Sequence, residues 1–176
     1  DLFQSRYSGN TTDVLLSSCN NVIPSNAQIT GNTTPCNGTP TTLTALPAGF
    51  QYTWNDNSTS QTLQTSNSGT YSVVVGNGDC RLPSVAATVT TVFPPNAPQT
   101  VNGNTAPCAG QTVQYDVATV AGATNYTWTL PAGWSINSGS GTNSISVSTG
   151  NNSGNISVYA SNNCGNSGDA TVSVSI

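Results

Sequence analysis

The chain has 176 residues and is nearly uncharged, with two Arg, six Asp and no Lys, Glu or His. The scarcity of basic residues excludes electrostatic binding to nucleic acid or an anionic membrane, and the absence of His, Lys and Glu argues against an acid–base or nucleophilic enzyme. Five cysteines in so short a chain favour an oxidising, extracytoplasmic compartment, and no apolar stretch approaches the roughly 20 residues of a membrane span.

The first predicted element is an N-terminal extension, residues 1–26, with a short apolar strand candidate at Val14, Leu15 and Leu16. One interpretation is a linker or the end of a preceding domain. The other is an extended arm that adds as a donor strand to a sheet edge of the next subunit. Such a head-to-tail contact would propagate into a fibre. The absence of a start Met and of a charged leader suggests a mature, processed chain.

Two β-sandwiches are predicted after the extension, over residues 27–94 and 95–176, because short apolar strands alternate with Gly, Pro, Asn and Ser turns. No window shows a helical period, so the predicted fold class is all-β. In the first sandwich we expect strands at 27–31, 40–45, 50–55, 61–64, 70–76 and 85–92. In the second we expect strands at 99–101, 112–118, 125–130, 144–148, 155–160 and 170–176.

The two sandwiches share a repeated sequence. Residues 31–38 read GNTTPCNG and residues 103–110 read GNTAPCAG, and each copy precedes a Tyr-Thr-Trp triplet, at 52–54 and at 126–128. A repeat of this length indicates two copies of one small domain. Two copies favour a function in spacing, linking or adhesion over a single catalytic pocket.

The motifs resemble known extracellular repeats. Residues 68–71, SGTY, resemble the tyrosine corner of immunoglobulin-like domains, although Val73 stands where antibodies carry the second cysteine. Residues 121–134 and 162–165 resemble PKD-like repeats, and the first unit resembles the Ig-like repeats found beside them in secreted surface adhesins of gliding and related bacteria. The resemblance covers about residues 27–176. It implies two tandem Ig-like/PKD-like β-sandwiches with stalk or adhesive roles, and it identifies no ligand.

The cysteine pairing has two interpretations. Pairing within each unit would join Cys36 to Cys80 and Cys108 to Cys164. However, Cys36 is expected at one end of its sandwich and Cys80 at the other, roughly 25–30 Å away, whereas a disulfide needs Cα atoms about 4.4–6.8 Å apart. We therefore favour a bridge between units, Cys36–Cys164, with Cys80 pairing with Cys19 or with Cys108 of a neighbouring chain. An odd cysteine count suggests an intermolecular bond or a free thiol.

Other candidate sites carry weaker signals. Two turns, Asn55-Asp56-Asn57 and Asn77-Gly78-Asp79, offer oxygens to Ca²⁺, but they also read as ordinary turn sequences, so we expect no cofactor and no metal site. Trp134 is a candidate sugar-stacking platform, against the simpler interpretation of a packed aromatic. Chance alone predicts about six N-glycosylation sequons in so Asn- and Ser/Thr-rich a chain, and seven occur, at Asn10, Asn32, Asn37, Asn57, Asn125, Asn151 and Asn155.

The sequence thus predicts a non-enzymatic, extracellular structural protein at the cell surface. Our interpretation is a subunit of a surface filament or adhesin stalk, a glycoprotein assembled head to tail with copies of itself through the N-terminal arm and the cysteines. The alternative is a carbohydrate-binding adhesion module that contacts surface glycans through Trp134.

Overall fold

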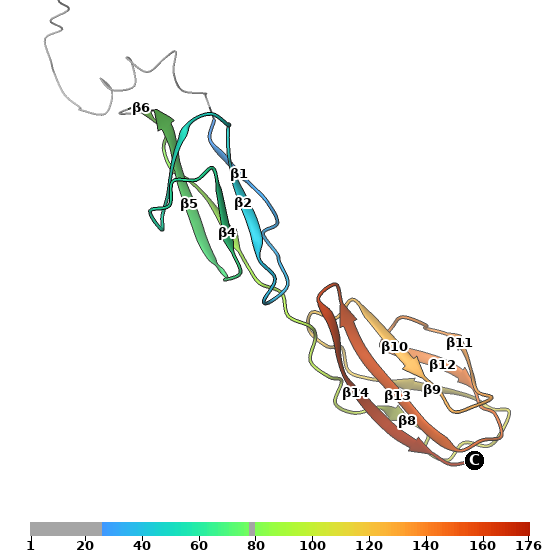
Figure 1. The fold of residues 1–176 in the computed structure, drawn as a ribbon. Helices are drawn as coiled ribbons and strands as arrows, with labels where there is room; N and C mark the ends of the chain where they lie inside the picture. Colours follow the sequence, from blue (N-terminus) through green and yellow to red (C-terminus); the bar gives the residue numbers. More distant parts are fainter. Residues whose placement is uncertain (1–25, 78–79) are drawn as a thin grey trace, which may run out of the picture. The chain divides into compact units, whose positions relative to one another are not determined.

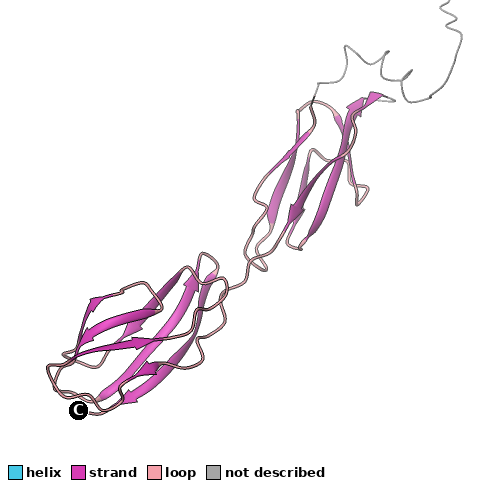
Figure 2. Cartoon of the chain, turned by 180° about the vertical axis from the view of Figure 1, so that it is seen from behind, coloured by secondary structure: helices cyan, strands magenta, loops and turns pink. Residues whose placement is uncertain are grey.

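The computed structural model describes residues 26–77 and 80–176, and these residues form two separate β units without a helix (Figures 1 and 2). The chain divides into Asp1–Thr91 and Val92–Ile176. The division lies three residues before the predicted boundary after residue 94. Each unit has its own core.

The first unit is a two-layer sandwich of antiparallel strands. One sheet has the order β1-β2-β4, and the other contains β3, β5 and β6, with β7 also paired to β5. This arrangement is the Ig-like one, in which the A, B and E strands face the C, F and G strands. The strands are β1 (Gln28–Thr30), β2 (Thr41–Leu46), β3 (Gln51–Trp54), β4 (Thr62–Thr65), β5 (Gly69–Asn77), β6 (Cys80–Arg81) and β7 (Val85–Val89).

The second unit repeats this plan, with one long strand, β14, paired to β13 where β6 and β7 both pair with β5. Its sheets have the orders β11-β12-β9-β8 and β10-β13-β14. Strand β11 pairs with β12 and has no counterpart among the described strands of the first unit. The strands are β8 (Asn102–Gly103), β9 (Thr112–Asp116), β10 (Asn125–Thr129), β11 (Ser135–Ser138), β12 (Ser144–Ser148), β13 (Gly154–Asn162) and β14 (Gly165–Val174).

Alternation along the strands builds each core. In β2, Leu43 and Ala45 are fully buried, whereas Thr42 before them is exposed and Thr44 between them is half-buried, as the period of two in a strand requires. Each fully buried aliphatic side chain stabilises its unit by about 1.5–3 kcal/mol. The first core comprises Leu43, Ala45, Tyr52, Trp54, Leu63, Val73, Val75 and Val89. The second comprises Val101, Tyr115, Val117, Tyr126, Trp128, Trp134, Ile145, Val147, Ile156, Val158, Ala160, Ala170 and Val174.

The repeated Tyr-Thr-Trp triplets make equivalent hydrogen bonds in the two units. The indole N–H of Trp54 donates to the Ser60 carbonyl at 2.8 Å, and that of Trp128 donates to the Thr142 carbonyl at 2.9 Å. Both bonds tie the strand to the connection that follows it. Because a buried indole N–H needs an acceptor, the triplet fixes the same connection in each unit.

The tyrosine corner predicted in the first unit is present. The Tyr71 hydroxyl donates to the Asn67 carbonyl at 3.0 Å and also contacts the Thr65 hydroxyl. It holds the turn before β5 against the end of β4. In the second unit, the register places Ile156 at the corresponding position, since Val158 faces Trp128 as Val73 faces Trp54.

Candidate functional site

The repeated octapeptides form the same loop in both units, and we call residues 31–38 and 103–110 the cysteine loops. Their first glycines have φ values of 139° and 148°, and their last glycines have 78° and 77°. Inside each loop, the side-chain oxygen of Asn32 or Asn104 accepts a backbone N–H two residues later, at 2.9 and 3.0 Å. The sequence repeat is therefore also a repeat of backbone conformation.

Both cysteine loops lie at the downstream end of their unit, where the chain leaves it. The N–H of Thr90 donates to the Thr33 carbonyl at 2.9 Å, and the N–H of Ser175 donates to the Thr105 carbonyl at the same distance. Thr90 directly follows Val89, which pairs with Gly69 at the start of β5. Cys36 and Cys108 each lie three residues after the accepting threonine.

The other two described cysteines lie at the upstream ends, and we call Cys80 and Cys164 the hairpin cysteines. Cys80 pairs with Asn77 at the far end of β5. Cys164 lies in the turn between β13 and β14, where Asn162 pairs with Gly165. This turn is joined to the start of its unit, because the Asn162 amide donates to the Phe93 carbonyl at 2.8 Å.

Asn162 has a role that the sequence analysis missed. Its side-chain oxygen accepts the N–H of Cys164 at 2.8 Å, while its amide nitrogen donates to the carbonyls of Phe93 and Gly122. One side chain thus orients the hairpin cysteine and anchors the hairpin to two other segments. The available signal was an Asn two residues before the cysteine, a spacing typical of Asx turns.

The oxidation states separate the cysteines into two classes. Cys36, Cys80 and Cys164 are disulfide-bonded and half-buried, whereas Cys108 is free and exposed. Cys19 lies outside the described residues. A Cys108–Cys164 bond within the second unit is therefore wrong.

The strand geometry also contradicts a Cys36–Cys80 bond. Thr33 lies beside the residue that follows Val89, and the nine residues of β5 then separate that end from the pair Asn77 and Cys80. Eight steps of a strand span roughly 27 Å. The three residues from Thr33 to Cys36 recover at most about 11 Å. The remainder exceeds the Cα separation of about 4.4–6.8 Å that a disulfide tolerates.

Trp134 is not the exposed stacking platform that the carbohydrate alternative requires. Only 8 % of its surface is exposed, and its ring centroid lies 6.4 Å from that of Tyr115. Its indole N–H donates to the Asn152 carbonyl at 3.0 Å. The indole is therefore part of the second core, with neither face left for a sugar ring.

The two turns weighed for Ca²⁺ use their oxygens internally. The Asp56 carboxylate accepts the hydroxyl of Ser58 at 2.7 Å and its N–H at 2.9 Å, and these bonds lower the pKa of Asp56. Asn55 bonds Thr70 and Ser72 instead of facing a cation. Residues 78 and 79 of the other turn lie outside the described part of the chain, within which no group of three His, Cys, Asp or Glu residues could hold a metal ion.

The remaining candidates lie partly within and partly outside the described residues. Asn10 and the arm at Val14, Leu15 and Leu16 lie outside the described residues. All six described sequon asparagines are exposed. Asn32 and Asn37 belong to the first cysteine loop, Asn57 lies in a turn at φ 68°, and the others are Asn125, Asn151 and Asn155.

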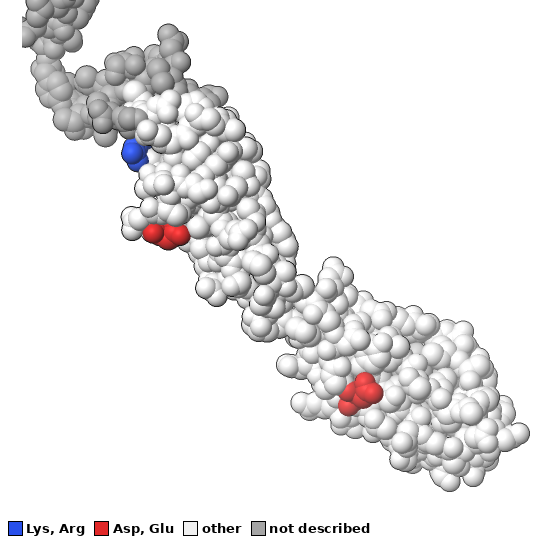
Figure 3. All heavy atoms as spheres, in the orientation of Figure 1, with Lys and Arg blue, Asp and Glu red and all other residues white. Residues whose placement is uncertain are grey.

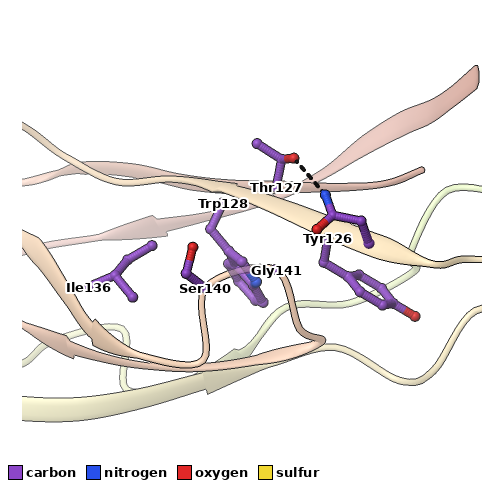
Figure 4. Close-up of a pocket in the computed structure, with 7 residues that line it drawn as sticks. Tyr126, Thr127, Trp128, Ile136, Ser140 and Gly141 are labelled. Atoms are coloured by element: carbon purple, nitrogen blue, oxygen red, sulfur yellow. Dashed lines mark hydrogen bonds between the residues drawn. The ribbon is translucent and has the colours of Figure 1, made fainter. Parts of the chain in front are cut away.

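A shallow hollow of about 360 Å³ lies beside β10 in the second unit (Figure 4). Tyr126 and Trp128 extend to one side of the strand and Thr127 to the other, and Ser140 and Gly141 lie across from the two aromatic rings (Figure 4). No ionisable carboxylate, amine or imidazole lines it. It offers the free edge of β10, because β10 pairs with β13 on one side and only with Gly141 on the other.

The described surface is almost free of charge. On the face in Figure 3, charged atoms occur at a few isolated places among neutral ones. The described ionisable residues other than tyrosine and cysteine are Asp56, Arg81, Asp116 and Asp169. In the part of the chain that the structure covers, no helix could span a membrane.

Comparison with known proteins agrees with the fold. Residues 94–174 match the family model of a PKD-like domain. The PKD-like unit contains β8 to β14, and the Ig-like unit before it repeats its plan. Domains of these two kinds generally have adhesive or structural roles outside the cell, and most are not enzymes.

Two solved structures illustrate the similarity. A chain in the crystal structure of mouse coronavirus receptor-binding domain complexed with its murine receptor is 12% identical, with a TM-score of 0.53 over 86% of this chain and 100% of that one. At this identity the similarity concerns the fold alone. Chicken CNTN1 FN1–FN3 domains are 13% identical, with a TM-score of 0.40 over 82% of this chain and 65% of that one. No curated protein matches the chain.

Proposed function

We propose that this chain is an extracellular structural element, a building block of a surface filament or adhesin stalk, whose two units are cross-linked by a disulfide between Cys36 and Cys164. One observation carries the proposal. Val92–Ile176 contains two cysteines, and Cys164 is disulfide-bonded while Cys108 is free. The partner of Cys164 therefore belongs to the preceding part of the chain.

Chain length favours Cys36 as that partner. The hairpin of Cys164 is bonded to Phe93, and the loop of Cys36 is bonded to Thr90. Phe93 lies three positions after Thr90, a span of at most about 11 Å. Cys80 lies at the opposite end of the Ig-like unit, about 27 Å along β5 from the end that carries Cys36. Cys80 is left with Cys19, one of the two partners expected from the sequence, since the other, Cys108, is free.

A cross-link at a junction of this kind makes two units behave as one. A junction of a few residues alone leaves neighbouring domains free to move. A second covalent connection removes most of that freedom, which suits a spacer or stalk better than it suits an enzyme. The nearly uncharged surface is consistent with packing against copies of the same chain, since little repulsion opposes it.

Head-to-tail assembly through the N-terminal arm is the finer part of the proposal. The arm at Val14, Leu15 and Leu16 would add to an open sheet edge of the next subunit. The edge strands among the described residues include β3 and β10. Deleting residues 1–20 should then leave folded monomers, and fibres that persist unchanged after the deletion would refute the exchange.

The cross-link is tested by replacing single cysteines. Cys164→Ser should let the two units tumble independently, seen as shorter rotational correlation times in ¹⁵N relaxation, and should increase proteolysis near residues 91–98. Cys108→Ser is the matched control, because it removes a cysteine from the same unit without breaking a bond. Equal relaxation in the two variants would contradict the proposal, as would a Cys36–Cys80 peptide in a non-reduced digest.

Filament formation has its own measurement. Negative-stain images and sedimentation of the native material should show long assemblies. A population of single chains at all concentrations would instead indicate a monomeric stalk fragment.

A further inference from the structure

Cys108 occupies in the PKD-like unit the place that Cys36 occupies in the Ig-like unit. Both are the sixth residue of a cysteine loop. Cys36 is disulfide-bonded, and Cys108 is free and exposed. Two copies of one loop thus exist in one chain with different oxidation states.

The two loops match in backbone as well as in sequence. The terminal glycines agree within about 10° in φ, at Gly31 and Gly103 and again at Gly38 and Gly110. Any side chain at Gly103 would clash, since a Cβ there would lie 2.2 Å from the Tyr115 ring. The conformation that presents Cys36 for bonding is therefore preserved around Cys108.

The loop around Cys108 is held firmly. The buried Thr149 hydroxyl donates to the Cys108 carbonyl at 2.8 Å, and the Cys108 N–H donates to the Gln111 side chain at 3.0 Å. The Thr149 carbonyl accepts the N–H of Gly110 at 3.0 Å. A rigid loop presents its thiol at a fixed place and loses little freedom when a bond forms.

The position of the loop relative to the departing chain also repeats. Thr90 bonds Thr33 as Ser175 bonds Thr105. Ile176 therefore corresponds to Thr91, and the residue after Ile176 would correspond to Val92. Cys108 therefore lies as close, along the chain and through its loop, to the residue after Ile176 as Cys36 lies to Val92.

We propose that Cys108 forms a disulfide with the hairpin cysteine of a like β-sandwich unit placed directly downstream. The bond takes the Cys36–Cys164 cross-link as its template, so it depends on the proposed function. In the reaction, two thiols lose two protons and two electrons and join through sulfur. A disulfide oxidant, such as a thiol oxidoreductase or oxidised glutathione, accepts them and is reduced to two thiols.

An extended chain tests whether Cys108 can accept such a partner. A second copy of residues 92–176 is joined directly to Ile176. The added copy carries Cys108→Ser, so that its own cysteine loop has no thiol. After oxidation in a glutathione buffer, a non-reduced digest should contain a peptide linking Cys108 to the hairpin cysteine of the added copy. The thiol of Cys108 should become unreactive to maleimide.

The control carries Cys164→Ser in the added copy as well and should leave Cys108 reactive. The same digest reports Cys36–Cys164. Absence of that peptide refutes the proposed function. Its presence with Cys108 still reactive refutes only the downstream bond.

Native material distinguishes two sources of the partner. If the unit belongs to the same polypeptide, the Cys108-linked peptide is found without a change of chain mass on reduction. If it belongs to a neighbouring chain, reduction lowers the mass of the species in denaturing electrophoresis. A Cys108 thiol that is free in the native assembly overturns the proposal.

Discussion

At the scale of single residues, hydroxyls and indoles that bond backbone carbonyls determine where the turns lie. Tyr71, Tyr115 and Trp54 each donate from a ring to a carbonyl of a neighbouring connection. Because the chain has few charges, these hydrogen bonds, and not ion pairs, hold the turns in place. Their loss should therefore be measurable one at a time.

Tyr71→Phe should destabilise the Ig-like unit by about 1 kcal/mol, the usual net value of one hydrogen bond. The ring stays and only the bonds to Asn67 and Thr65 are lost. Urea unfolding followed by the fluorescence of Trp54 measures the change. An unchanged midpoint would show that the tyrosine corner contributes nothing to stability here.

The buried hydroxyl of Tyr115 predicts that the PKD-like unit loses stability at alkaline pH. Burial raises the pKa of its hydroxyl above the ordinary value of about 10. Because the folded pKa is the higher one, this stability is present below pH 10 or so and is lost as pH rises towards the folded value. Unfolding midpoints measured across that range should fall in the parent and less in Tyr115→Phe.

The comparison is best made with Cys108→Ser in both proteins, since a free thiol promotes disulfide exchange at high pH. Tyr115→Phe also loses the 2.6 Å bond to the Asn104 carbonyl. A lower stability of Tyr115→Phe at neutral pH is thus expected, and only the slope with pH tests the buried hydroxyl. Identical slopes would contradict the assignment.

At the scale of elements, the cysteine loop is constrained at one end and open at the other. A Cβ on Gly103 would overlap the Tyr115 ring, whereas one on Gly110 meets nothing within 4 Å. Both glycines have positive φ, which costs an alanine about 1–2 kcal/mol. Alanine substitutions at the two positions therefore distinguish the free-energy cost of positive φ from the cost of a steric clash.

Gly103→Ala should destabilise the PKD-like unit by at least about 2 kcal/mol more than the conformational cost alone, because backbone or ring must shift. Gly110→Ala should cost only that conformational term. Thermal unfolding of the two variants compares them directly. Equal losses would mean that the Tyr115 ring yields without penalty.

The sequence predicted most strands of both cores, since Leu43, Tyr126 and Val158 follow a strict period of two. The strand predicted at 99–101 is wrong, because the first strand of the second unit is β8 at Asn102–Gly103, and the short β6 was not predicted. The sequence missed β11 because residues 135–138 carry a single apolar side chain, Ile136, so no alternation is visible. It also began β14 five residues late, since its first half, Gly165 to Asp169, is polar. Short polar strands are held by pairing to a neighbour, which local composition does not reveal.

The candidate site was predicted in part. Placing Cys36 and Cys80 at opposite ends followed from counting residues along one strand, and the structure bears this out. The anchoring of the loop around Cys108 and the role of Asn162 depend on contacts between distant segments, Thr149 with Cys108 and Phe93 with Asn162. No local pattern encodes such contacts.

At the scale of the whole molecule, two cores that share no buried residue predict two unfolding transitions once the disulfides are reduced. A destabilising change such as Gly103→Ala should then move one transition and leave the other. Calorimetry of the reduced protein would show this as one shifted peak. A single peak that moves as a whole would mean that the units unfold together without any cross-link.

The positions of Cys36 and Cys164 have a mechanical consequence. When the chain is pulled from its two ends, tension passing through a bond between these residues bypasses the whole segment from 37 to 163. Among the described strands, only β1 and β14 then carry load, and β14 is pulled lengthwise along its paired neighbour β13. Single-molecule stretching should release the bypassed length only after reduction, so a Cys36–Cys164 bond would protect the first core from force and would load the second core only through β14.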